Sequence, residues 1–282
     1  MKSSARLSAA IAFLLLISLQ SPAGAASEET LACISLGSNP ERARCLEPSF
    51  RSAVQSGNTA AALAEMIELF QSGLIDDCHM FAHHLGHVAF EEVADFVPAM
   101  RAGGPRCANG YYHGVVESAL HNPSAAGHEH HTQLDISRFC SPFRRESKIY
   151  DGCVHGLGHG LMHRFGHDVL QSLDMCKQLS GDYERERCQG GVFMENSMQY
   201  LELDEELYQQ MAPAACSGLP LSRDLLELCY DQIGEVAMFY YEHDLARATE
   251  LCAAIEESWG RSACTEGAQD ELETINLERK GG

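Results

Sequence analysis

The cysteines of this chain fall into pairs of nearly constant spacing, and no other feature of the sequence constrains the fold as strongly. All twelve lie after residue 25, and five successive pairs are separated by 12 or 13 residues: Cys33 and Cys45, Cys140 and Cys153, Cys176 and Cys188, Cys216 and Cys229, and Cys252 and Cys264. The first cysteines of the last four pairs recur after 36, 40 and 36 residues. A period of this length predicts repeated helical hairpins.

The residues around the cysteines predict the two helices of each hairpin. One helical pattern covers residues 168–180 and resumes over residues 182–203 after a break at Gly181. Another hairpin covers residues 244–278, with its turn at Trp259-Gly260. The first cysteine lies toward the end of one helix and the second lies early in the next, so a disulfide would join the two helices across the turn. We therefore predict an all-α helical-hairpin solenoid with intra-hairpin disulfides.

A disulfide that closes a loop of this length stabilises the fold by roughly 3 kcal/mol in the chain-entropy model. The two remaining cysteines, Cys78 and Cys107, have no nearby partner in the sequence and are predicted to pair with one another.

The spacing of these helix pairs resembles that of secreted, cysteine-rich relatives of the Sel1-like and tetratricopeptide repeat proteins. Proteins of that kind build a solenoid from helix pairs of about this length, some with one disulfide per repeat. The resemblance covers residues 140–278 at the level of spacing, and the usual consensus residues of the repeat are not cleanly present. It implies an α-solenoid and transfers no function.

The first 25 residues have the features of a secretory signal peptide. Lys2 and Arg6 precede an apolar run over residues 7–19, and Ala23-Gly24-Ala25 offers a small-residue cleavage site. No later stretch is long and apolar enough to cross a bilayer. An even number of cysteines after the signal fits the disulfides of an oxidising compartment. We therefore predict a secreted or periplasmic protein with no membrane partner.

The charge of the exported chain excludes one class of partner. Without Lys2 and Arg6, 18 of the 20 basic residues remain against 40 acidic residues, which is a net charge of about −22. Such a surface repels phosphate backbones, so no nucleic-acid partner is expected. We divide the rest of the chain into a histidine-rich helical region, residues 26–167, and regular disulfide-stapled repeats, residues 168–282. The two are predicted to form one continuous unit.

Thirteen of the fourteen histidines fall between residues 79 and 167, and several are spaced like ligands on a helix. Two runs follow four-residue steps: His79, His83 and His87, and again His155, His159 and His163. On an α-helix this step places successive imidazoles about 6 Å apart on nearly the same face. Two imidazoles so placed can bind one metal ion.

Alignment of the repeats on their second cysteine brings further side chains into register. When Cys78 is counted as a second cysteine, the residue six positions after the cysteine is a histidine in three successive copies: His84, His113 and His159. The residue ten positions after the cysteine is Val88, Glu117 and His163 in the same three copies. Equivalent positions of a solenoid stack on one surface, and a tightly curved stack could bring these side chains to one centre.

These patterns predict a transition-metal site built from helical histidines and one glutamate: His83, His84, His87, His113, Glu117, His155, His159 and His163. Imidazole combined with carboxylate suits zinc, copper or iron. Glu117, or Glu195 further along the chain, could instead serve as a general base.

Three glycines interleave with the histidines of residues 154–162, at Gly156, Gly158 and Gly160. Each glycine inside a helix costs about 1 kcal/mol relative to alanine. Their spacing indicates that another backbone or a bound group approaches closely. Tight helix packing in the repeat interior and a loop are the alternatives.

Two classes of function remain open. The first is an exported metalloprotein, either a plain metal binder or an enzyme that uses the ion for hydrolytic or redox chemistry. The second is a non-catalytic solenoid scaffold that binds a protein or glycan partner. Histidines that converge inward favour the first class, and histidines on an outward convex face favour the second.

Overall fold

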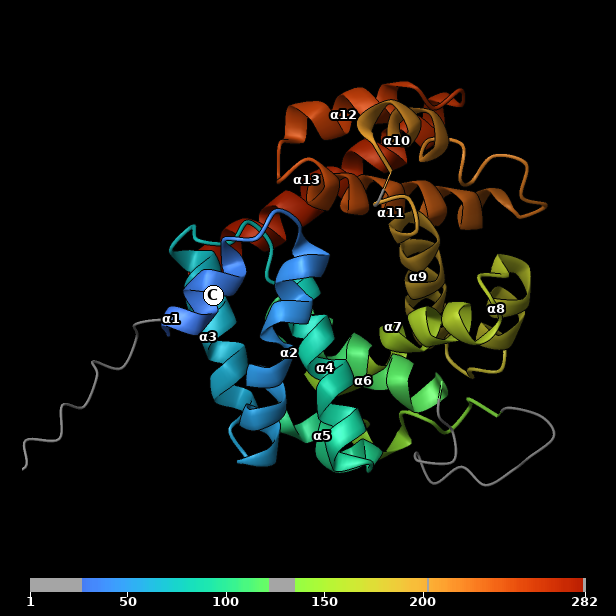
Figure 1. The fold of residues 1–282 in the computed structure, drawn as a ribbon. Helices are drawn as coiled ribbons and strands as arrows, with labels where there is room; N and C mark the ends of the chain where they lie inside the picture. The colour runs from blue at the N-terminus through green and yellow to red at the C-terminus, as the bar shows by residue number, and fades with distance from the viewer. Residues whose placement is uncertain (1–26, 122–134, 202, 281–282) are drawn as a thin grey trace, which may run out of the picture.

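The structure, a computed structural model, describes residues 27–121, 135–201 and 203–280, so the predicted signal peptide lies outside the described residues. Over these ranges the regular secondary structure is helical, with turns and loops between the helices and no strand (Figure 1). The α-helices follow one another as α1 (Glu28–Ile34), α2 (Asn39–Gln55), α3 (Thr59–Gln71), α4 (His79–Val93), α5 (Phe96–Ala102), α6 (Gly110–His121), α7 (Ser147–Arg164), α8 (Val169–Cys176), α9 (Asp182–Met198), α10 (Glu205–Met211), α11 (Arg223–Tyr240), α12 (Leu245–Ala253) and α13 (Ser258–Arg279). A short 3-10 helix, η1 (Ser141–Phe143), precedes α7. No helix of the described chain has the length and apolarity that a membrane span requires.

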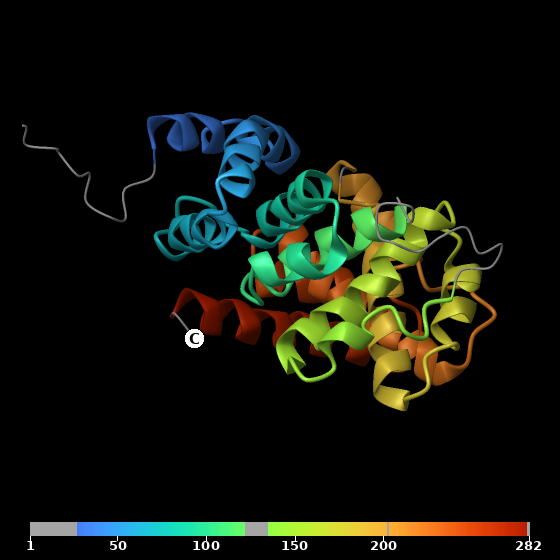
Figure 2. The same cartoon turned by 90° about the horizontal axis from the view of Figure 1, so that it is seen from below.

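The long helices form the continuous layer of a solenoid. Helices α2, α4, α6, α7, α9, α11 and α13 contact one another in that order, and most of the short helices pack against their neighbours in this series. The stack curves strongly, and α13 returns beside the N-terminal helices (Figure 2). There the carbonyl oxygen of Glu278 accepts hydrogen bonds from Gln71 at 2.9 Å and from Arg106 at 3.1 Å. The predicted all-α solenoid is confirmed.

All six predicted disulfides are present, including Cys78–Cys107. In the five hairpin pairs the second cysteine is always the seventh residue of its long helix. Each bridge therefore ties the preceding segment to the same level of a long helix. The predicted boundary at residue 167 falls in the turn between α7 and α8, and the division into two regions stays a prediction.

The helix starts follow local capping chemistry. Asp168 and Asp244 are the N-cap residues of α8 and α12, and their carboxylates accept backbone N–H groups of the first turn. Gly181 precedes α9, as predicted. The turn predicted at Trp259-Gly260 is wrong, because both residues lie inside α13. Gly260 is needed for packing, since a Cβ there would lie 2.8 Å from the ring of Tyr230.

Candidate metal centre

Glycines let α7 and α9 cross with their backbones in contact. A Cβ on Gly158 would lie 2.2 Å from the carbonyl oxygen of Cys188. A Cβ on Gly191 would lie 2.1 Å from the carbonyl oxygen of His155. The close approach inferred from the glycine spacing is therefore that of another helix backbone.

Glycines also allow close backbone contact between the other helices that carry histidines. Gly86 on α4 faces the backbone of α6 and Gly114 on α6 faces the backbone of α4, with no room for a Cβ on either. Gly156 and Gly160 on α7 face α6, where a Cβ would come within 3.3 Å of the α6 backbone. Helices α4, α6, α7 and α9 are consequently spaced closely enough for their polar side chains to meet.

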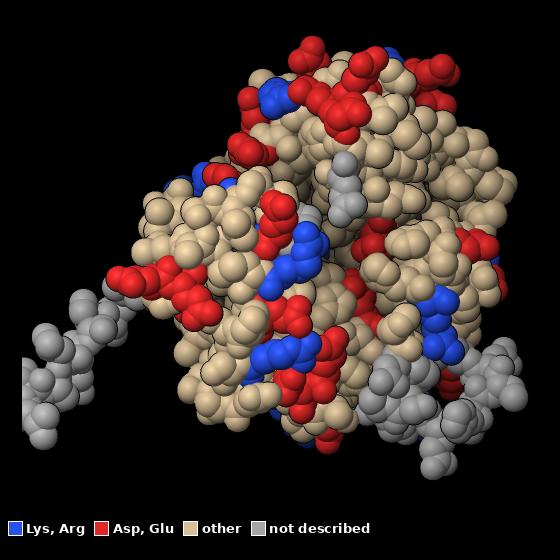
Figure 3. All heavy atoms as spheres, in the orientation of Figure 1, with Lys and Arg blue, Asp and Glu red and all other residues tan. Residues whose placement is uncertain are grey.

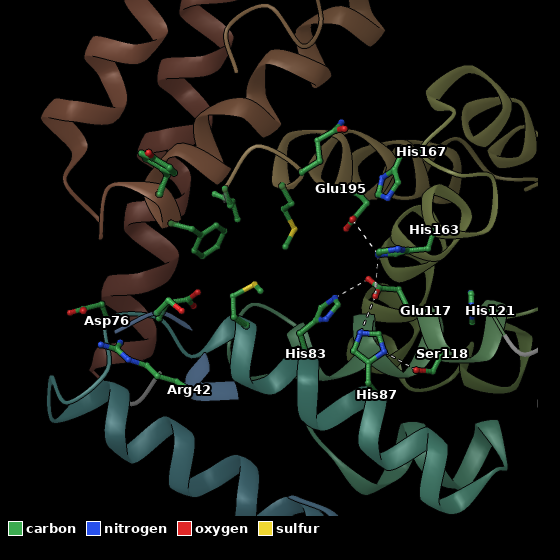
Figure 4. Close-up of a pocket in the computed structure, with 18 of the residues that line it drawn as sticks. Arg42, Asp76, His83, His87, Glu117, Ser118, His121, His163, His167 and Glu195 are labelled. Atoms are coloured by element: carbon green, nitrogen blue, oxygen red, sulfur yellow. Dashed lines mark hydrogen bonds and ion pairs between the residues drawn. The ribbon is translucent and has the colours of Figure 1, made fainter. Parts of the chain in front are cut away.

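Glu117 of α6 lies at the meeting point of imidazoles from α4 and α7 (Figure 4). Its buried carboxylate is 2.8 Å from Nε2 of His83 and 3.1 Å from Nε2 of His87. Nε2 of His163 approaches from the other side, at 3.6 Å. His87 is held in place by a 2.7 Å hydrogen bond between Nδ1 and the Ser118 hydroxyl.

A second carboxylate, Glu195 of α9, completes this group. Its oxygens lie 3.2 Å from Nε2 of His163 and 2.9 Å from Nδ1 of His159. His167 adds an exposed imidazole close to His163 and Glu195. We call His83, His87, Glu117, His163 and Glu195 the outer cluster.

Behind the outer cluster lies a group of buried imidazoles, the inner cluster, made of His79, His113, His155 and His159. His113 is at its centre, with ring centroids 5.3 Å from His79, 4.9 Å from His155 and 4.8 Å from His159. Both ring nitrogens of His113 are buried and have no hydrogen-bond partner among the described residues. A buried polar group left in this state costs about 1–3 kcal/mol.

The outer cluster is electrostatically arranged for ionised carboxylates. Burial opposes ionisation of Glu117, but the charge and hydrogen bond of His83, together with His87, hold its pKa well below the usual value. Glu195 is similar, because hydrogen bonds from His159 and His163 outweigh burial and lower its pKa to about 2. The hydrogen bond to Glu195 raises the pKa of His163 to about 9.

Three of the four inner imidazoles, those of His79, His113 and His155, are held neutral by their surroundings. Burial, followed by the proximity of His159 and His155, holds the pKa of His113 well below its usual value. Burial and the charge of Arg187 do the same for the pKa of His155. Burial lowers the pKa of His79 to about 3. Neutral imidazole is the form that binds metal ions.

The outer cluster opens onto a cavity of about 1100 Å³ on the concave side of the solenoid. Its wall includes the five residues of the cluster, His167 and the aromatic side chains of Phe239 and Tyr240 from α11. Figure 3 shows the corresponding hollow near the middle of that face. The four histidines of the inner cluster are not among the residues that form the wall of this cavity.

The structure places all the predicted ligands but His84 in one of these two clusters. His84 lies on another side of α4, with Nε2 3.5 Å from Glu47 of α2. The predicted ligand set omits His79, which lies in the inner cluster, and His167, which lies beside the outer cluster. The four-residue step from His83 to His79 and from His163 to His167 is the signal that could have added them.

No family model, curated protein or solved structure matches this chain. The class of protein is therefore defined by the fold and the clusters themselves. The chain is an all-α repeat protein stapled by disulfides between adjacent helices, with buried histidine and glutamate groups that could hold a metal ion.

Proposed function

We propose that this protein is an exported metalloprotein that binds a transition-metal ion through the outer cluster. The observation that carries the proposal is the environment of Glu117. This buried carboxylate is within 3.6 Å of imidazole nitrogens from three side chains on two helices. Carboxylate and imidazole donors that converge in this way suit zinc, copper or iron.

The charge of the site supports the same proposal. Glu117 and Glu195 are both buried and both have lowered pKa values, so two negative charges lie beside each other in the protein interior. Buried charges are unfavourable unless they are paired or bound to metal. A divalent cation that displaces the proton of His163 would balance the charge of both carboxylates, with Glu117 as its ligand.

The position of the outer cluster favours hydrolysis as the reaction. The outer-cluster residues lie on the cavity wall, so an ion held by His83, His87, Glu117 and His163 would be accessible to a substrate in the cavity. When bound, such an ion would supply a water activated for attack at neutral pH. Glu117, met by imidazoles on two sides, serves as a ligand in this scheme. Glu195, at the edge beside His163, serves as general base.

The six intrachain disulfides support the placement of the protein in an oxidising compartment. We therefore include in the proposal that the N-terminal signal peptide exports the chain. The inward convergence of the histidines favours the metalloprotein over the non-catalytic scaffold. A protein or glycan partner stays a prediction, as does redox chemistry in place of hydrolysis.

The first test is the metal content of the untagged protein, secreted and purified without chelator and measured by plasma mass spectrometry. The wild type should carry zinc, copper or iron close to stoichiometrically. Replacing His87 and His163 by alanine should lower the metal bound per chain. His84→Ala is the matched control, because His84 is a partly exposed histidine of the same helix as His87 but lies outside the cluster.

Metal far below one ion per chain, even after reconstitution with each of the three metals, would contradict the proposal. So would equal metal content in the His87/His163 variant and the His84 control. Hydrolysis is tested separately, with a panel of ester, phosphoester and peptide substrates. Metal-dependent turnover should be lost in Glu195→Gln while the bound metal is retained.

A further inference from the structure

We infer that the inner cluster is a second metal site, separate from the outer cluster and built from imidazoles alone. It goes beyond the proposed function, which concerns the outer cluster. The ligands would be His113, His155 and His159, with His79 as the fourth. The ion it fits is a d10 cation that accepts imidazole ligands, either copper(I) or zinc.

Nitrogen atoms without partners carry this inference. Both nitrogens of His113, Nε2 of His79, Nδ1 of His155 and Nε2 of His159 are buried and have no hydrogen-bond partner in the described part of the chain. Buried polar groups are normally hydrogen-bonded, so several exceptions in one place need an explanation. A shared cation would give all of these side chains a partner at once.

The unpartnered nitrogens belong to rings that face one another. One ligand atom on each of His113, His155 and His159 lies within 4.8 Å of the other two. A tetrahedral ion with bonds of about 2.0–2.1 Å spaces its nitrogen ligands by roughly 3.4 Å. Small rotations of these side chains would close the remaining distance.

The other nitrogen of each outlying ring is held by an acceptor, as in known metal sites. Nδ1 of His79 lies 3.1 Å from the carbonyl oxygen of Cys107. Because a carbonyl can only accept, this nitrogen carries the proton and Nε2 keeps its lone pair. Nδ1 of His159 similarly lies 2.9 Å from Glu195, and His155 is hydrogen-bonded to the backbone of Arg187.

Glu195 places the two clusters next to each other. One of its oxygens contacts His163 of the outer cluster and the other contacts His159 of the inner cluster. The inner site offers imidazole nitrogens alone, whereas the outer site combines imidazoles with two carboxylates. The two sites therefore differ in their ligand atoms, and replacing the ligands of one site should leave the ligands of the other in place.

The test is a metal titration of the full secreted protein and three variants, with zinc alone or, under anaerobic conditions, copper(I) alone. His113→Leu removes the central inner ligand and fills its space. The double change His87→Ala with His163→Ala removes outer ligands, and His84→Ala is the control. With the better-bound of the two probes, wild type and control should retain two ions per chain after gel filtration. Each cluster variant should retain one.

The inference is overturned if His113→Leu retains as much metal as the wild type with both zinc and copper(I). Loss of all metal in both cluster variants would also overturn it, because that result means a single shared site. If instead only His113→Leu loses metal, the inner site stands and the proposed function of the outer cluster fails.

X-ray absorption on the outer-cluster variant gives a second readout. The remaining ion should have nitrogen ligands with imidazole scattering and no carboxylate ligand. A carboxylate in its coordination shell would contradict the all-imidazole site. If His113→Leu does not fold, as judged by circular dichroism, His155→Gln replaces it in the same comparison.

Discussion

Two adjacent glycines of α9 form a matched pair that tests how α7 and α9 are held together. A Cβ on Gly191 would lie 2.1 Å from the carbonyl oxygen of His155, whereas the nearest atom to a Cβ on Gly190 is 3.6 Å away. Ordinary contacts begin at 3.4 Å. In Gly191→Ala the two backbones must therefore separate by roughly 1 Å, because packed interiors leave no slack. In Gly190→Ala nothing has to move.

The expected magnitude follows from two opposing effects. Alanine in place of glycine inside a helix gains about 1 kcal/mol, and both variants receive this gain. Overpacking costs Gly191→Ala a further 1–3 kcal/mol, approximately. In a chain of this size each kcal/mol shifts the melting temperature by about 2–4 °C. Gly191→Ala should thus melt about 2–12 °C below Gly190→Ala, which should itself melt slightly above the wild type.

The assay is thermal unfolding followed by circular dichroism, with the disulfides intact and the protein free of metal. A titration with zinc follows, because separation of α7 from α9 moves His159 and His163 away from Glu195. Gly191→Ala should bind zinc more weakly than Gly190→Ala. Equal melting temperatures, or a gain in both variants, would refute the backbone contact from which this argument starts.

Three further outcomes are expected. Metal-free His113→Leu should be more stable than the metal-free wild type by about 1–3 kcal/mol, because it removes two buried nitrogens without partners. Chemical denaturation measures this difference, and a less stable variant would contradict the expectation. Burial and the charge of Asp231 raise the pKa of Glu235 to about 8 from 4.5, so the folded state binds this proton more tightly than the unfolded state. The stability that the proton provides is fully present below the unfolded value and is lost as the pH rises toward about 8. Glu235→Gln should make the melting temperature fall less over this interval, and identical pH profiles would speak against the assignment. Replacing Cys176 and Cys188 by alanine should lower the unfolding free energy by about 3 kcal/mol in urea titrations, and an unchanged midpoint would count against the stapling role of this bridge.

Local features of the sequence were sufficient to predict the helical hairpins and their cross-links. The cysteines of each hairpin are separated by only 12 or 13 residues, so their pairing depends on a short connection and the first two turns of the helix that follows it. The N-caps at Asp168 and Asp244 are equally local. The turn at Trp259-Gly260 was misplaced because the role of Gly260 depends on Tyr230, which belongs to another hairpin.

The sequence by itself therefore determined the class of fold, the disulfides and the kinds of side chain available for chemistry. Only the tertiary structure decided which of them meet. Successive residues of a helix point about 100° apart, so only one of His83 and His84 can face the neighbouring helix α6. The sequence does not say which one; the contact of Gly86 with the α6 backbone decides it. The division into outer and inner clusters likewise depends on backbone crossings between distant helices, and on Glu195 reaching both. Those contacts join residues far apart in the chain, and spacing alone does not encode them.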